Sequence, residues 1–200
     1  GLTTAGAAPF VDYDCNGTLA DPYGIWGFED PAARWLDGTG LLGGQLPTPF
    51  NDGTGFPSFM AATFRNNDAS ADQRPDLFCG QTRTTGDWYA ADNPTSPYNQ
   101  EWFQYVAALE GYLSGLGLLD RAYYYVANEP QDQADYDAVA WYTRHLEQAA
   151  PGLRLMVSEQ PRSEIFDHPD YVADGQVDVW LAVLHAFDPE VSGDRKRYHG

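Results

Sequence analysis

The chain has 200 residues, of which 43% are hydrophobic and 14% aromatic, which is enough apolar material for a buried core. Its 11 basic and 29 acidic residues give a formal net charge of −18 at pH 7, which repels phosphate backbones and anionic lipid head groups. No apolar stretch approaches the roughly 20 residues that cross a bilayer, so we expect a folded acidic protein that binds neither nucleic acid nor membranes.

The first half of the chain is irregular and rich in loops. Short apolar runs at residues 9–13 and 56–64 are bounded by turn residues and predict two strands. Between them, the many Gly and Pro residues of 38–55 predict a long surface loop. A helical turn is expected to begin at Pro31, with Asp30 as its cap.

The second half alternates helices and strands. Helical spacing of apolar residues predicts one helix after the cap Asn99 and another after Asp132 or Asp135. Runs rich in aromatic and β-branched residues predict strands at residues 121–127, 153–158 and 177–184.

This alternation indicates an α/β fold with a parallel sheet, to which all five predicted strands are assigned. We expect a single TIM-barrel-like domain over residues 1–200, with an irregular part at 1–97 and regular βα units at 98–200. An eight-stranded barrel typically needs about 250 residues. The polar run 195–200 contains no closing element, so the expectation is an incomplete, truncated barrel.

Ligand sites in parallel α/β folds form at the carboxyl ends of the strands, where the connecting loops converge. Any single carboxylate there could equally well cap the following helix, but a cluster of them favours a site. The candidates that follow predicted strands are Asp12, Asp14, Arg65, Asn128, Glu129, Glu159, His185 and Asp188.

Glu129 is the leading candidate because it directly follows an aromatic strand and precedes Pro130. We expect Tyr123, Tyr125 and Trp180 to desolvate its side chain partly, which favours a proton-donating carboxyl group. Glycoside cleavage usually needs two carboxyl groups, roughly 5 to 5.5 Å apart for retention or about 6.5 to 9.5 Å for inversion. Glu159, one predicted strand along the chain, is the nearest partner.

The neighbouring residues suggest substrate contacts. The Asn128 amide suits a sugar hydroxyl or N-acyl group, and the rings of Tyr125 and Trp180 suit the apolar faces of pyranoses. His185 either binds substrate or is a hydrogen-bonded structural residue, and the pattern leaves both open.

Metal and cofactor signals are weak. Asp12, Asp14 and Asn16 fit the opening of a calcium loop, but its twelfth position is Tyr23 instead of the usual Glu. No zinc spacing, phosphate loop or GxSxG elbow occurs, so no other cofactor is expected. Cys15 and Cys79 form either one bridge or two free thiols.

The second half of the chain also resembles a known family. The stretch from Tyr98 to Gly200 resembles the domain of unknown function 4091, which is related to the catalytic barrel of glycoside hydrolase family 123. The residues that carry the likeness are AYYYVANEP, LRLMVSEQP, VDVWLAVLHAFDP and RKRYHG.

The resemblance implies that Glu129 is the proton donor. Family 123 places before that Glu an Asp that orients the substrate's acetamido group, and Asn128 stands at this position. Asn-Glu-Pro is also similar to the strand-four signature of the large retaining-glycosidase clan, whose Asn binds the 2-hydroxyl. That clan's nucleophile comes from a later strand, so here it lies beyond Gly200 or is replaced by Glu159 or Asp188.

We therefore expect a secreted or surface glycoside hydrolase-like protein whose partner is a carbohydrate substrate. The oxidising exterior implied by this function favours a Cys15–Cys79 bridge. The alternative is a non-catalytic carbohydrate-binding or structural, surface-assembly protein on the same fold. The sequence does not indicate an oligomeric state.

Overall fold

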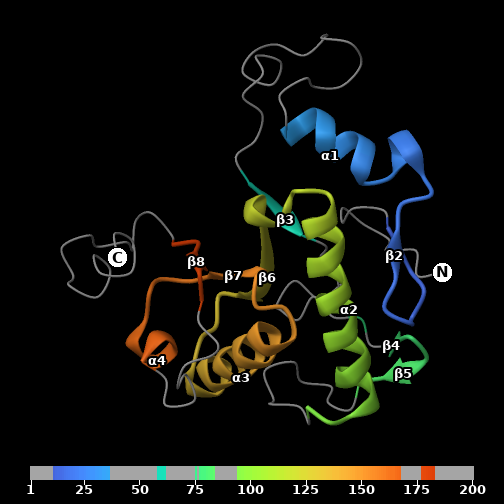
Figure 1. Ribbon diagram of the computed structural model, residues 1–200. Helices are drawn as coiled ribbons and strands as arrows, with labels where there is room; N and C mark the ends of the chain where they lie inside the picture. The colour runs from blue at the N-terminus through green and yellow to red at the C-terminus, as the bar shows by residue number, and fades with distance from the viewer. Residues whose placement is uncertain are drawn as a thin grey trace.

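The computed structural model describes residues 11–36, 58–61, 75, 77–83, 94–167 and 177–182, and every structural statement below concerns these residues. The molecule is a mixed α/β structure built on a four-stranded parallel sheet (Figure 1). The strands lie in chain order: β3 (Phe59–Ala61), β6 (Ala122–Asn128), β7 (Arg154–Ser158) and β8 (Val179–Trp180). The expected parallel sheet is confirmed, and each of these strands falls within or next to a predicted run.

Three helices occupy the connections between these strands: α2 (Pro97–Gly115), α3 (Gln133–Ala149) and the short α4 (Ser163–Phe166). The start of α3 follows the prediction, because Asp132 accepts a hydrogen bond from the N–H of Asp135 and the Asp135 carboxylate accepts one in return. The expected cap of α2 is wrong. Ser96 caps this helix through the N–H of Asn99, and Pro97 occupies the first turn, where its missing N–H is not needed.

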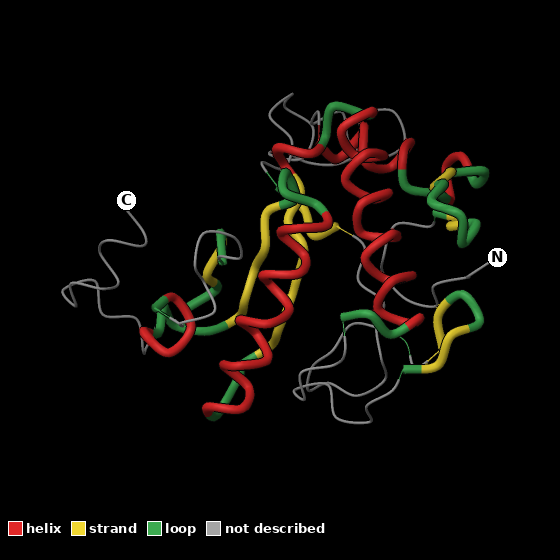
Figure 2. The backbone as a smooth tube through the Cα atoms, turned by 60° about the horizontal axis from the view of Figure 1, so that its bottom comes forward, coloured by secondary structure: helices red, strands yellow, loops and turns green. Residues whose placement is uncertain are grey.

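Helices α2 and α3 lie side by side, with Phe103 of α2 against Trp141 and His145 of α3 (Figure 2). Alternate strand residues join the same hydrophobic core as the helices; we call this side of the sheet the core face. Its strand residues are Ala61, Ala122, Tyr124, Leu155 and Val157. The opposite face carries Met60, Tyr123 and Tyr125, which are exposed or half-buried.

The N-terminal part forms two antiparallel hairpins. β1 (Asp12–Tyr13) pairs with β2 (Leu19–Ala20), and β4 (Leu77–Phe78) pairs with β5 (Gln81–Thr82). The assignment of residues 9–13 to the parallel sheet is therefore wrong for β1, because the turn at 14–18 reverses the chain and supplies its partner locally. Strands β2, β4 and β5 were not predicted, because each has only two residues and none lies in a longer apolar run.

A disulfide joins Cys15 and Cys79, with an S–S distance of 2.05 Å, and so ties the turns of the two hairpins together. The ring of Tyr13 stacks on Phe78 at 5.8 Å, and Phe78 packs edge-on against Trp102 of α2 at 5.0 Å. The hairpins are therefore held to each other and to α2. Of the two alternatives for the cysteines, the bridge is confirmed.

Helix α1 (Glu29–Leu36) follows a 3-10 turn, η1 (Gly24–Trp26). The Asp21 carboxylate accepts hydrogen bonds from the N–H groups of Phe28 at 2.6 Å and Glu29 at 2.8 Å. The expected cap is thus wrong: Asp21 satisfies the start of α1, whereas Asp30 lies inside its first turn. The predicted loop at 38–55 lies outside the described residues.

A second 3-10 turn, η2 (Leu119–Arg121), leads directly into β6. Within the described parts of the chain, no helix combines the length and the hydropathy that a membrane span requires.

Candidate functional site

A β-bulge near the end of β6 determines which side chains meet at the carboxyl edge of the sheet. Tyr125 pairs with Met156 and Ala127 with Val157, so Val126 is the extra residue. Side chains alternate along a strand, and one inserted residue moves every later side chain to the other face. Asn128 consequently pairs with Ser158 on the face that carries Tyr125, and not on the core face.

Tyr125 and Asn128 form a direct contact on this face. The hydroxyl of Tyr125 donates a 2.5 Å hydrogen bond to Oδ1 of Asn128. Burial raises the pKa of Tyr125, a hydrogen bond with the Ser158 side chain lowers it, and the nearby charge of Glu129 raises it. The hydroxyl therefore stays protonated at neutral pH. Because it donates to Oδ1 of Asn128, the orientation of this amide is fixed, and its NH2 group is the end that donates hydrogen bonds.

Glu129 leaves the sheet in an unusual backbone conformation. Its φ of 50° lies in the left-handed region, which non-glycine residues adopt at a cost of about 1–3 kcal/mol and which is concentrated at functional sites. Its N–H donates a 2.8 Å hydrogen bond to the carbonyl oxygen of Ser158, and its own carbonyl accepts one from Gln131 at 2.6 Å. The loop after β6 is thus fastened to the end of β7.

Glu129 is exposed, so the expected partial desolvation by aromatic rings is wrong. The physical reason is local. The positive φ turns the chain at the end of the strand, and it is the following Pro130 that is buried.

Glu159 follows Ser158 as Glu129 follows Asn128. Because Asn128 and Ser158 are paired and neighbouring strands lie about 4.8 Å apart, the two glutamates leave the sheet from adjacent positions. Oε1 of Glu159 accepts hydrogen bonds from the N–H of Gln160 at 2.6 Å and from Nε of Arg162 at 3.2 Å. The Glu159 side chain is only 11% exposed.

Arg162 also contacts the helix that follows β6. Its guanidinium carbon lies 5.8 Å from the ring centroid of Tyr136 in the first turns of α3. The Tyr136 hydroxyl makes a long 3.5 Å contact with the carbonyl oxygen of Gln131. Sequence reasoning missed both residues. The spacing of three between Glu159 and Arg162 was the available signal for the ion pair, whereas no local pattern links Arg162 to Tyr136.

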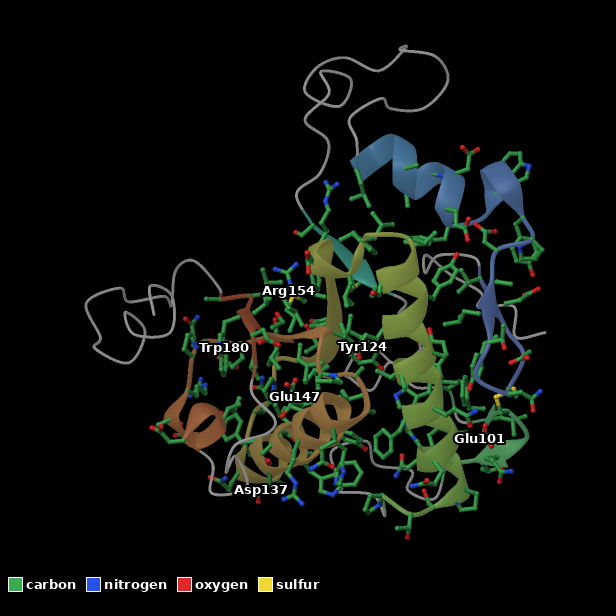
Figure 3. The ribbon with its side chains drawn as sticks, viewed as in Figure 1. Glu101, Tyr124, Asp137, Glu147, Arg154 and Trp180 are labelled. Atoms are coloured by element: carbon green, nitrogen blue, oxygen red, sulfur yellow. A yellow bond between two sulfur atoms is a disulfide. The ribbon has the colours of Figure 1, made fainter. Side chains whose placement is uncertain are left out.

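The structure does not bring Trp180 together with Tyr125. Trp180 pairs with Val157, a core-face residue, and packs against the hydrophobic core. Figure 3 shows it on β8, at one side of the sheet. In the same figure Arg154, at the start of β7, and Asp137, in the first turns of α3, lie at opposite ends of the sheet, and the carboxyl edge is the Asp137 end.

Asp12 and Asp14 belong to the β1–β2 hairpin. Figures 1 and 2 show this hairpin on the far side of α2 from β6. Asp12 accepts a 2.5 Å hydrogen bond from the hydroxyl of Tyr23. Oδ1 of Asp14 accepts the N–H groups of Asn16 and Thr18 at 2.8 and 3.0 Å, and these hydrogen bonds hold the pKa of Asp14 below its usual value.

The calcium expectation at Asp12, Asp14 and Asn16 finds no support in this geometry. In the described ranges, no group of three or more His, Cys, Asp or Glu residues is arranged to hold a metal ion. The Asp14 carboxylate instead stabilises its own turn. Three other candidates, Arg65, His185 and Asp188, lie outside the described residues.

No protein-family model, curated protein or solved structure matches the chain. The geometry at the carboxyl edge of β6 and β7 is therefore the basis for a functional proposal.

Proposed function

We propose that the chain is a glycoside hydrolase-like protein in which Glu129 and Glu159 act together on a glycosidic bond. The observation that carries the proposal is the register of β6 and β7. The pairing of Asn128 with Ser158 puts a glutamate at the same step beyond each strand. Two carboxyl groups on either side of the scissile bond are the minimal machinery of most glycoside hydrolases.

The two glutamates have different surroundings, which suits different roles. Glu129 is exposed, and its side chain can reach a leaving-group oxygen as a general acid. Glu159 is nearly buried and held by Arg162, which suits the positioned partner that acts as nucleophile or base.

Tyr125 and Asn128 complete the proposed site. The hydrogen bond between them fixes the Asn128 amide on the face of the sheet that Tyr125 shares. A fixed amide can bind a sugar hydroxyl, and a half-buried tyrosine ring offers an apolar surface to a pyranose. The substrate in this proposal is a carbohydrate.

The fold and the disulfide are compatible with this function. Four parallel strands in chain order are the arrangement expected for part of a TIM-like barrel, and the proposed site occupies its carboxyl edge. A disulfide persists in oxidising environments, which supports secretion or a surface location.

A second candidate is a carbohydrate-binding protein without catalysis. It is favoured by the exposure of Glu129, since catalytic groups usually lie where the closed site excludes bulk water. In this alternative Asn128 and Tyr125 still bind sugar, and Glu159 serves only to anchor its loop.

The test is hydrolysis of a panel of aryl glycosides covering neutral hexosides, pentosides and N-acetylhexosaminides, with oligosaccharide binding measured in parallel. We expect Glu129→Gln and Glu159→Gln each to lower kcat by about 10²- to 10⁴-fold while sugar binding persists. Glu164→Gln is the matched control, because Glu164 is an exposed glutamate of the neighbouring helix α4.

The outcomes separate the candidates. Binding without turnover in the wild type supports the second candidate, and a chain that neither binds nor cleaves any sugar of the panel overturns both. Hydrolysis that survives both substitutions contradicts the assigned roles.

A further inference from the structure

Two donors of the described chain approach the same carboxylate oxygen of Glu159. The N–H of Gln160 and Nε of Arg162 lie 2.6 and 3.2 Å from Oε1. A carboxylate that accepts from a backbone N–H and a guanidinium group at once has a fixed orientation.

Arg162 is itself held in place by an aromatic ring. Its guanidinium group lies over the Tyr136 ring, whose face attracts a cation. Its planar group needs little further ordering to make a directed hydrogen bond. Arg162 is also the only basic residue in the segments that follow β6 and β7, which are residues 129–132 and 159–167. Acidic residues outnumber it there.

These contacts form a chain between the two glutamates. Gln131 donates to the carbonyl of Glu129 and accepts the long contact from the Tyr136 hydroxyl. The Tyr136 ring lies against Arg162, which donates to Glu159. The Glu129 N–H also donates to the carbonyl oxygen of Ser158. The loop after β6 and the loop after β7 are therefore connected in two places.

We infer that Arg162, seated on Tyr136, is a positioning residue that orients the Glu159 carboxylate. The inference rests on the proposed function and assigns a role to two residues outside the pair of carboxyl groups. Rate in glycoside cleavage depends on the placement of both groups, and a misplacement of about 1 Å lowers a rate by roughly 10²-fold.

The test compares Arg162→Ala, Arg162→Lys and Glu159→Gln on whichever aryl glycoside of the panel the wild type cleaves. We expect Arg162→Ala to lower kcat by about 10- to 100-fold with little change in KM, because the orientation of Glu159 affects the reacting step more than substrate binding. Arg162→Lys restores part of the loss. Guanidinium chloride at low millimolar concentration partly rescues Arg162→Ala and leaves Arg162→Lys and the wild type unchanged.

The Tyr136 side chain is tested with a matched pair. Tyr136→Phe keeps the ring under the guanidinium and is expected to stay close to the wild-type kcat, whereas Tyr136→Leu loses part of it. Unfolding midpoints are measured for every variant, so that only variants folded at the assay temperature are compared. Recovery of kcat on addition of guanidinium separates the two roles. An ion pair that only stabilised the fold would not give such recovery in a variant that is already folded.

The results distinguish this inference from the proposed function. If the wild type cleaves no glycoside, the proposed function fails and the inference falls with it. If Glu159→Gln abolishes turnover while folded Arg162→Ala retains the wild-type kcat, the proposed function stands and the inference is overturned. A loss in Arg162→Ala that guanidinium does not rescue also overturns it.

Discussion

The hydroxyl of Tyr125 donates to Oδ1 of Asn128 across 2.5 Å, although the two residues are three positions apart on one strand. Regular alternation would put side chains at odd spacing on opposite faces of the sheet. The extra residue Val126 cancels that alternation, so the bulge is what allows the contact.

This contact predicts a measurable effect on stability. Tyr125→Phe removes the hydroxyl that bonds to Asn128 and Ser158, and is expected to lower the free energy of unfolding by about 0.5–1.5 kcal/mol for each hydrogen bond lost, as measured in urea titrations. Tyr123→Phe is the matched control, because Tyr123 occupies the same face of the same strand and makes no hydrogen bond within the described chain. Equal effects of the two substitutions would contradict the structural role of the pair.

His145 makes the stability of the α2–α3 interface depend on pH. Its ring lies 5.6 Å from that of Phe103 and 4.5 Å from that of Trp141. Burial, and then the charge of Arg144, lower the pKa of His145 below its ordinary value of 6.5. The unfolded chain therefore binds the proton more readily, and stability that is present above pH 6.5 is lost as the pH falls through the folded-state pKa.

Urea midpoints measured between pH 8 and pH 5 check this prediction. We expect His145→Gln to flatten the decline below about pH 6.5, and Arg144→Gln to reduce it less, because burial is the larger cause. Parallel curves for the wild type and His145→Gln would show that other groups govern the acid response.

Reduction of the disulfide is expected to destabilise the protein. Cys15 and Cys79 are separated by 64 positions, and the chain-entropy treatment gives a bridge of that span about 4 kcal/mol. A reductant should lower the thermal unfolding midpoint of the wild type to that of the Cys15→Ala/Cys79→Ala double variant. A reductant that leaves the midpoint unchanged, although thiol titration shows two free thiols, would refute a stabilising bridge.

Two glycines are expected to respond to substitution with opposite signs. A Cβ atom at Gly27 overlaps the carboxylate of Asp21, which holds the start of α1. Gly27→Ala should therefore destabilise the protein by about 1–3 kcal/mol. Gly111, in the middle of α2, has open space around it, so Gly111→Ala should stabilise by about 0.5–1 kcal/mol. Urea denaturation of both variants measures the signs, and a stabilising Gly27→Ala would contradict the close packing of Asp21.

The helices and parallel strands of the second half were predictable because their signals are local. Hydrophobic period, a capping aspartate and a stop at Pro151 together locate α3, and Asp132 was among the two expected caps. The cap of α2 was missed because Ser96 and Asn99 both favour that position, and only the backbone geometry decides between them. The cap of α1 was missed because Asp21 reaches it from seven residues away.

The candidate site was predictable only in part. The sequence identifies Asn128, Glu129 and Glu159 from their positions after strands, and the register then pairs Asn128 with Ser158 and so makes the glutamates neighbours. The bulge at Val126 leaves no mark in a run of aromatic and aliphatic residues, so the face shared by Tyr125 and Asn128 could not be derived. Contacts between separate loops, such as Arg162 on Tyr136, need the tertiary structure.

The order of the strands has a consequence for how the chain assembles. Each of β6, β7 and β8 pairs with the sheet strand that precedes it in the chain, so none has to be inserted between two strands that are already joined. The sheet can grow outward from one margin as synthesis proceeds, and each new strand needs only the strand before it as a template. Such a molecule is suited to vectorial folding, in which every new βα unit docks on a template completed before it.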